Sequence, residues 1–359
     1  MSCLLALGRD TRGYPVGCNG DEGAWRFHRR YFARGGCCVR RASSDPRCWR
    51  CRAACHGSSS SNAWLPTSAA ARIRPGQAAE PCQERDSQVI SLIDTHSHLD
   101  TSAFDSDRDA VLAAALKAGV HAIVLIGYDP ERWRSTSDLC QRYPFLVRAV
   151  GVHPNSASIW SPSVQQLLER EVASGTVIAI GETGLDFFRE HADPALQLAA
   201  FRAQLALAKT CGLPIIIHQR AAEAEVLATL AEFAPLRGVM HCFSGDTLFA
   251  NQCRGFGLHL GIGGVATYPK SIAVREAVAH VPISSLLLET DAPYLAPQSR
   301  RGKRNEPAFL IETLETVAEV RDEPQESVAD ATTENAEQLF GPTLAAARAA
   351  GMDSALCRW

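Results

Sequence analysis

Short runs of β-branched and aliphatic residues alternate with longer segments of mixed polarity from residue 92 onward. The short runs predict eight strands, at 92–98, 121–127, 146–152, 177–183, 214–218, 237–243, 259–264 and 285–291. The intervening segments, such as 107–118, 161–174, 194–211 and 221–233, space Ala and Leu so that one face is apolar, which predicts helices packed on a sheet. Continuously apolar strands indicate a covered parallel sheet, and eight strand–helix units in roughly 250 residues predict an α/β protein with a (β/α)8 TIM barrel.

A doubly wound parallel sheet is the alternative fold for this pattern. Its dinucleotide-binding members carry a Gly-rich loop after the first strand, whereas the first strand here runs into His-Ser-His-Leu-Asp. We therefore favour the barrel and place it at residues 91–341. Two further helices, at about 306–321 and 325–340, would close it, and we expect residues 342–359 to form an irregular C-terminal tail.

The first ninety residues differ in composition from the rest of the chain. They contain 14 Arg, no Lys and 7 acidic residues, a net charge of +7, whereas the remainder has 22 basic and 32 acidic residues, a net charge of −10. They also hold 8 of the 13 cysteines, and they show no sustained periodicity and no apolar run long enough to span a membrane. We expect residues 1–90 to be a disordered or non-native extension.

Three explanations of this extension stay open. Cys48, Cys51, Cys55 and His56 have the spacing of a zinc knuckle, but no second ligand pair is clearly spaced. The Arg and Ser content suits a transit peptide, whereas the acidic residues do not. The composition also resembles a GC-rich upstream region read as protein, which we favour. The five scattered cysteines after residue 90 argue against a disulfide framework, so we expect a cytoplasmic protein.

Histidine or a carboxylate stands at the ends of six of the eight predicted strands. His96 and His98 end the first strand and, two residues apart, point from the same face. The other ends carry His153, Glu182, His218, His241 and Asp291. Barrel strands end at one shared mouth, where the chemistry of such folds lies. Each residue alone could be a core histidine, a helix cap or a turn residue, but together they would be poorly satisfied without a cation.

This donor set predicts a catalytic metal centre. Mixed imidazole and carboxylate ligands suit Zn, Mn or, with water, Mg. The strand ends carry no cluster of cysteines, which argues against a closed structural zinc site. The four imidazoles and two carboxylates of His96, His98, His218, His241, Glu182 and Asp291 exceed what one catalytic ion needs. We therefore expect two divalent ions bridged by Glu182. The candidate catalytic residues are Glu182, Asp291 and His153. We expect Asp94 to fix an imidazole tautomer and Glu289 to move a proton or orient a ligand.

Seven motifs, in order over residues 92–341, resemble the TatD family of metal-dependent deoxyribonucleases, which belongs to the amidohydrolase-like barrels. The motifs are Asp-Thr-His-Ser-His-Leu-Asp, Gly-Val-His-Pro, Ile-Gly-Glu-Thr-Gly-Leu-Asp, Pro-Ile-Ile-Ile-His, His-Cys-Phe-Ser-Gly, Glu-Thr-Asp-Ala-Pro-Tyr-Leu and Arg-Gly-Lys-Arg-Asn-Glu-Pro. The resemblance implies that the metal ligands are His96, His98, Glu182, His218, His241 and Asp291. It also implies hydrolysis of phosphodiester bonds in DNA, at ends or in single strands, by a metal-activated water.

A basic loop after the last strand supplies candidate contacts to such a substrate. Phosphate contacts provide much of the affinity for nucleic acid, so we expect substrate binding by Arg301, Lys303, Arg304 and Asn305. A terminal base could stack on one of the aromatic residues Phe187, Phe188, Phe243, Tyr268 and Tyr294. Two other functions stay open: hydrolysis of a different ester or amide on the same metals, such as aminoacyl-tRNA deacylation, and a non-catalytic metal-binding scaffold.

Overall fold

Eight parallel strands form a single sheet in the order β1 to β8. The structure is a computed structural model that describes residues 90–189 and 191–356. The strands are β1 (Leu92–Ser97), β2 (Val120–Gly127), β3 (Leu146–Val150), β4 (Val177–Asp186), β5 (Ile215–Arg220), β6 (Gly238–Met240), β7 (Leu258–Ile262) and β8 (Leu286–Leu288). A parallel bridge between Ser97 and Ala292 brings the last strand back to the first, so the sheet is a nearly closed barrel. The predicted TIM barrel is confirmed.

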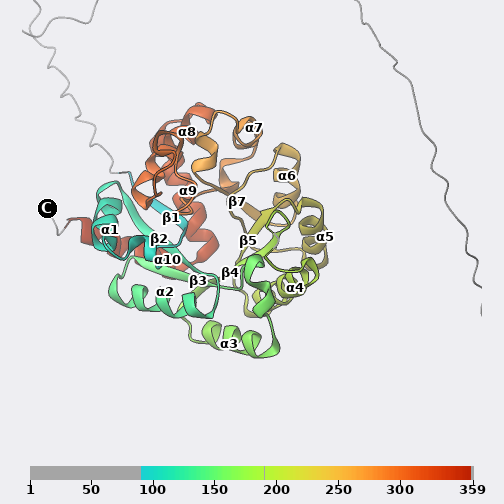
Figure 1. Ribbon diagram of the computed structural model, residues 1–359. Coiled ribbons are helices and arrows are strands. Elements are labelled where there is room, and N and C mark those ends of the chain that lie inside the picture. The colour runs from blue at the N-terminus through green and yellow to red at the C-terminus, as the bar shows by residue number, and fades with distance from the viewer. Residues whose placement is uncertain (1–89, 190, 357–359) are drawn as a thin grey trace, which may run out of the picture. The chain divides into compact units, whose positions relative to one another are not determined.

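Helices follow the strands and surround the barrel (Figure 1). They are α1 (Arg108–Lys117), α2 (Pro130–Arg142), α3 (Pro162–Ala173), α4 (Pro194–Cys211), α5 (Glu223–Phe233), α6 (Thr247–Gly255), α7 (Ile272–His280), α8 (Leu310–Arg321), α9 (Gln325–Phe340) and α10 (Pro342–Leu356). Three of them begin at a proline that follows a capping side chain, namely Asp129, Ser161 and Asp193. Pro is favourable at the first helical position because it lacks the N–H that would have no partner there.

The strand side chains divide into two apolar sets because successive residues point to opposite faces. One set packs against the surrounding helices and includes Ile123, Leu125 and Leu260. The other set, which includes Val124, Ile216 and Leu287, packs together with the end of α9 and with α10. The second set fills the barrel interior below the strand ends, as the layered packing of this fold requires.

The C-terminal residues form a helix, so the expectation of an irregular tail is wrong for Pro342–Leu356. Leu344 and Ala347 of α10 are buried in the inner apolar set. In Figure 1, α10 passes behind β2 and β3, which it contacts. The alternation of Ala with a few larger residues gave little periodicity in the sequence, and only packing against the barrel identifies the buried face. The expectation for residues 1–90 lies, apart from Ile90, outside the described residues.

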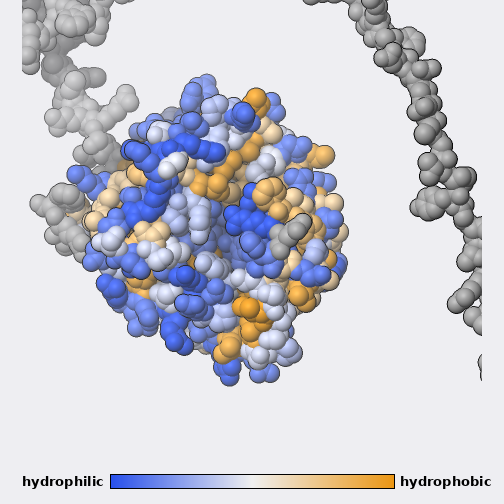
Figure 2. All heavy atoms as spheres, in the orientation of Figure 1, coloured by the Kyte–Doolittle hydropathy of each residue, from blue (hydrophilic) through white to orange (hydrophobic). Residues whose placement is uncertain are grey.

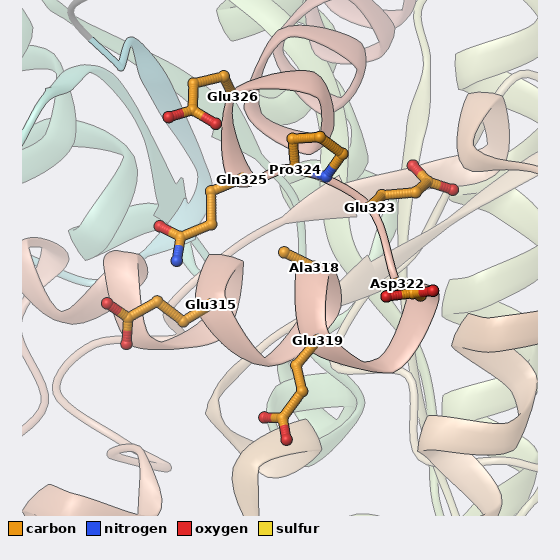
Figure 3. A pocket seen from close by; sticks show the side chains of 8 residues that line it. All are labelled: Glu315, Ala318, Glu319, Asp322, Glu323, Pro324, Gln325 and Glu326. Carbon is orange, nitrogen blue, oxygen red and sulfur yellow. The ribbon is translucent and has the colours of Figure 1, made fainter. Parts of the chain in front are cut away.

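The surface of the barrel is hollowed in more than one place. The face seen in Figure 2, onto which the strand ends open, is hollowed near its centre and hydrophilic around the hollow. Where α8 meets α9, a separate hollow is lined by five acidic side chains, Glu315, Glu319, Asp322, Glu323 and Glu326 (Figure 3). Among the described helices, none has both the length and the apolar composition needed to cross a membrane.

Replacing Gly351 with Ala tests whether α10 is part of the folded barrel. A Cβ at Gly351 would lie 1.8 Å from the carbonyl oxygen of His121 in β2. We expect Gly351→Ala to lower the free energy of unfolding by about 1–3 kcal/mol, the usual cost of overpacking, although Ala normally stabilises a helix. Urea unfolding followed by circular dichroism measures the change.

Gly255→Ala is the matched control for that variant. Gly255 ends α6, and a Cβ there would have no heavy atom within 4 Å. We expect this substitution to leave stability unchanged or raise it by up to about 1 kcal/mol. Equal stability of the two variants would contradict the close packing of α10 on β2.

Candidate metal centre

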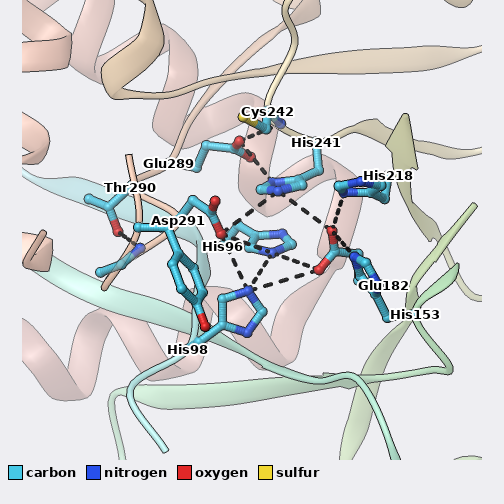
Figure 4. Close-up of polar contacts among 12 residues, drawn as sticks. His96, His98, His153, Glu182, His218, His241, Cys242, Glu289, Thr290 and Asp291 are labelled. Carbon is cyan, nitrogen blue, oxygen red and sulfur yellow. Dashed lines mark hydrogen bonds and ion pairs between the residues drawn. The ribbon is translucent and has the colours of Figure 1, made fainter. Parts of the chain in front are cut away.

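Glu182 lies at the centre of a cluster of five histidines at the strand ends (Figure 4). Its Oε2 is 3.4 Å from Nε2 of His96 and 3.9 Å from Nε2 of His98. Its Oε1 is 2.8 Å from Nδ1 of His218 and 3.7 Å from Nε2 of His241. The two carboxylate oxygens therefore face two different groups of imidazoles.

Asp291 faces the same cluster from β8's end. Its Oδ1 is 3.3 Å from Nε2 of His98, 3.8 Å from that of His96 and 3.9 Å from that of His241. The rings of His96 and His241 are stacked with their centroids 3.4 Å apart. All six residues predicted as metal ligands thus lie together, on β1, β4, β5 and the segments that follow β1, β6 and β8.

Backbone hydrogen bonds across the seam between β1 and the segment after β8 hold two parts of the cluster in register. The N–H of Asp291 donates to the carbonyl of His96 over 2.9 Å, and the N–H of His98 donates to the carbonyl of Ala292 over 2.7 Å. Asp291 and Cys242 both have left-handed backbone conformations, with φ of 60° and 48°. Such conformations are costly for residues with a Cβ and are found where the surrounding structure fixes a functional side chain.

Asp94 ties this seam together, and the expectation that it fixes an imidazole tautomer is wrong. Its Oδ1 accepts from the N–H groups of Thr290 and His96, and its Oδ2 accepts from the Thr290 hydroxyl over 2.6 Å. Burial raises the pKa of Asp94 to about 7 in spite of these bonds. The residue acts on the site through the backbone between β1 and β8.

Glu289 and Asp186 stand behind two of the histidines. Glu289 Oε1 is 2.9 Å from Nδ1 of His241 and accepts from the N–H of Cys242 over 2.6 Å. Asp186 Oδ2 is 3.5 Å from Nε2 of His218. A carboxylate on the outer nitrogen fixes which nitrogen of a ring presents its lone pair to the centre. Glu289 is thus placed beside the outer nitrogen of His241, and the two roles predicted for it stay predictions.

Sequence reasoning missed Asp186 as a site residue, as well as two glutamines of α4. The amide of Gln197 pairs with both the N–H and the carbonyl of Asp186, and that of Gln204 pairs with both groups of Val152, beside His153. Both side chains are buried. The available signal was their spacing of seven residues, which puts two buried amides on one helical face.

Facing carboxylates give the centre a strong affinity for positive charge. Burial disfavours the imidazolium of His241, but Glu289 and Glu182 outweigh burial and raise its pKa to about 10. The pKa values of His98 and His218 are raised in the same way against burial. The imidazoles in turn hold the pKa of Glu182 well below its ordinary value, although burial acts to raise it. Divalent cations would compete with these protons, so the donor set fits metal binding.

The donor atoms also meet the spatial requirement for metal binding. In each of two groups, His96 with Glu182 and His241 and His96 with His98 and Asp291, the ligand atoms lie within 4.8 Å of one another. Nδ1 of His96 and of His98 and Nε2 of His218 are buried without a hydrogen bond to a described residue. The residues therefore form a candidate metal site.

The four residues predicted to bind substrate are placed differently. Arg301 and Lys303 are exposed on the loop, so substrate binding by them stays a prediction. Arg304 forms a two-pronged ion pair with Asp107 and a further one with Glu306. Asn305 is fully buried, and its amide donates to the carbonyls of Thr290 and Tyr294. In this structure Arg304 and Asn305 therefore fix the loop.

Known proteins similar to this chain match the barrel over nearly their whole length. Residues 93–341 match the family TatD related DNase. The metal-dependent hydrolase YabD of Bacillus subtilis is 37% identical over 251 residues, which are 69% of this chain and 98% of YabD. The 3′-5′ ssDNA/RNA exonuclease TatD of Citrobacter rodentium is 38% identical over 263 residues, which are 71% of this chain and 100% of that enzyme.

A solved structure is also similar to this chain. The crystal structure of YJJV, a TatD homologue from Escherichia coli, matches with a TM-score of 0.67 and 33% identity, covering 70% of this chain and 98% of YJJV. The family match, the two relatives and the solved structure all align with the barrel, which carries the clustered histidines and carboxylates. The chain therefore belongs to the TatD family, and it is a metal-dependent hydrolase of the TatD-related DNase type.

Proposed function

We propose that this protein is an exonuclease that hydrolyses phosphodiester bonds at the ends of single-stranded nucleic acid, with DNA as a substrate. The observation that supports this most is the position of Glu182, whose two oxygens face separate groups of imidazoles at the barrel mouth. The similar enzyme named 3′-5′ ssDNA/RNA exonuclease supports the substrate class. The strand-end location of the cluster is where barrel enzymes carry out their chemistry.

Two divalent cations are part of the proposal. His96, His98 and Asp291, whose donor atoms lie close together, would hold one ion. His218 and His241, which both face Glu182 Oε1, would complete the second, and Glu182 would bridge the two. Nitrogen-rich ligands favour Zn or Mn over Mg, which prefers oxygen ligands and water. Bound at this place, such ions lower the pKa of a water and offset the negative charge of a phosphodiester.

Two carboxylates behind the cluster decide which ring nitrogens bind metal. Glu289 Oε1 lies 2.9 Å from Nδ1 of His241, so a single ring proton held on Nδ1 would leave the Nε2 lone pair directed toward the centre. Asp186 lies beside Nε2 of His218, so Nδ1 of that ring faces Glu182. The two rings thus face Glu182 with different nitrogens, His241 with Nε2 and His218 with Nδ1. With metal bound, each carboxylate would hold the ring proton on the outer nitrogen, as metal-binding histidines need.

His153 has the tautomer of a hydrogen-bond donor. Its Nδ1 accepts from the N–H of Asn155 over 3.0 Å, so the neutral ring carries its proton on Nε2, which is 3.6 Å from Glu182 Oε1. Burial is the main cause that lowers the pKa of His153 to about 3, so the ring is neutral at physiological pH. A protonated Nε2 cannot also bind a metal. We therefore assign His153 to proton donation or substrate orientation.

We also propose that the protein works in the cytoplasm. The cysteines of the described barrel, Cys140, Cys211, Cys242 and Cys253, are all free thiols. Free thiols without a disulfide framework are typical of a reducing compartment.

Metal removal and loss of Asp291 test the proposed function. We expect EDTA to abolish shortening of a single-stranded oligonucleotide and an added divalent cation to restore it. Asp291→Asn should lower activity by more than the roughly 10- to 100-fold loss typical of an outer-sphere partner, because it removes a direct ligand. Separate 5′- and 3′-labelled substrates with a panel of Zn, Mn and Mg report the rate and the polarity.

Two outcomes would contradict this proposal. Loss of neither label nor length with any cation would exclude the nuclease function. Unchanged metal-dependent activity in Asp291→Asn would exclude the ligand assignment while leaving the activity in place.

The Gly261→Ala variant tests the orientation of His241. A Cβ at Gly261 would clash with Oε2 of Glu289, so the carboxylate must leave its present position. Because the clash displaces Glu289 from its position beside His241, we expect metal affinity to fall by about 10- to 100-fold, as measured by competition with a chromogenic chelator. At the control position Gly263, the nearest atom to a Cβ is 3.5 Å away, so Gly263→Ala should keep wild-type affinity. Equal affinity in both variants would show that Glu289 has no orienting role.

A further inference from the structure

Two arginines at the barrel mouth lie over aromatic rings. The guanidinium of Arg220, at the end of β5, is 3.9 Å from the ring centroid of Phe188. The guanidinium of Arg301 is 4.0 Å from the ring centroid of Tyr268. Phe188 is 64% exposed, whereas phenylalanine side chains are most often buried. Both pairs therefore present a positive charge and a π surface side by side.

These two guanidiniums differ from their neighbours because no carboxylate of the described residues forms an ion pair with either. In the same loop as Arg301, Arg300 pairs with Glu312 over 3.1 Å and Arg304 pairs with Asp107 over 2.7 Å. The charges of Arg300 and Arg304 are thus compensated within the protein. Among the described residues, the charges of Arg220 and Arg301 have no such compensation.

The two pairs belong to different parts of the barrel, one at the ends of β4 and β5 and the other in the segments after β7 and β8. Arg220 lies two residues after His218, and Phe188 lies two residues after Asp186, whose Oδ1 accepts from the N–H of Phe188 over 3.1 Å. On the other side, the hydroxyl of Tyr268 donates to the carbonyl of Ala296 over 2.9 Å, five residues after Asp291. Each pair is therefore anchored to a segment that also carries a residue of the cluster.

Stacking leaves the edge of a guanidinium free to bind a phosphate. Proteins that bind single strands combine positive charges for the backbone with aromatic rings for the bases, and a duplex would hide its bases from such rings. We propose that Arg220–Phe188 and Arg301–Tyr268 are two nucleotide subsites on either side of the reacting phosphate. Each arginine binds a flanking phosphate, and Phe188 stacks an unpaired base. This inference rests on the proposed exonuclease function and names the residues that select single strands.

Kinetics on an oligothymidylate and on bis(4-nitrophenyl) phosphate, a small diester without bases or flanking phosphates, test the subsites. We expect Arg220→Gln and Arg301→Gln each to raise KM for the oligonucleotide about tenfold and to change hydrolysis of the small diester less than twofold. Each should also reduce the slope of log(kcat/KM) against log salt by about 0.7, the value for one phosphate contact on a single strand.

Phe188→Leu separates stacking from charge. We expect about a tenfold loss of kcat/KM on the oligonucleotide with an unchanged salt slope, because the substitution removes the ring and no charge. The loss should disappear on an oligonucleotide with abasic sites at its terminal nucleotides, where there is no base to stack. An equal loss on normal and abasic substrates would exclude the stacking role.

Arg202→Gln is the matched control for the charge change. Arg202 is exposed on α4 and pairs with Glu232 of α5 over 2.7 Å, away from the strand ends. Its substitution should leave KM and the salt slope at wild-type values. Wild-type KM and slope in both Arg220→Gln and Arg301→Gln, in an enzyme that shortens oligonucleotides, would overturn the subsites alone. A wild-type protein that hydrolyses neither substrate would overturn the proposed function and this inference with it.

Discussion

The buried carboxylate of Glu182 is the constraint on which the rest of the structure depends. An uncompensated charge in a protein interior costs on the order of several kcal/mol, so such a group needs partners on every side. Five imidazoles supply them, and they come from β1, β5 and the segments after β3 and β6. No single element could provide this environment. A closed parallel barrel can, because it brings the ends of all its strands to one place.

The surroundings of the cluster serve to hold ring orientation and strand register. Glu289 and Asp186 lie beside the outer nitrogens of His241 and His218, and Gly261 leaves the space that Glu289 occupies. Gln204 of α4 pairs with the backbone next to His153 as another strand would. Since metal binding depends on the direction of each lone pair, these contacts decide the chemistry as much as the ligands do.

Charge is distributed unevenly over the barrel. The chain from residue 91 onward has a net charge of −10, and an acidic hollow lies between α8 and α9. At the mouth, by contrast, Arg220 and Arg301 lie over aromatic rings without an ion pair to a described residue. Local arrangement therefore matters more than net charge for binding an anionic strand, because screening limits electrostatic interactions to about 10 Å.

The sequence by itself determined the barrel and the six clustered residues. Strand periodicity is a local property, and a parallel barrel converts a list of strand ends into a single site, so His96 and Asp291 could be placed together although they are far apart in the chain. The spacing of apolar residues could not predict α10 as a helix, because its Ala-rich sequence does not distinguish a buried face from an exposed one. Its packing against β2 shows which face is buried. Nor could the sequence separate Arg301 from Arg304 or reveal Asp94 as a link between β1 and β8. Whether a side chain finds a partner depends on residues distant in sequence, and only the tertiary structure brings those together.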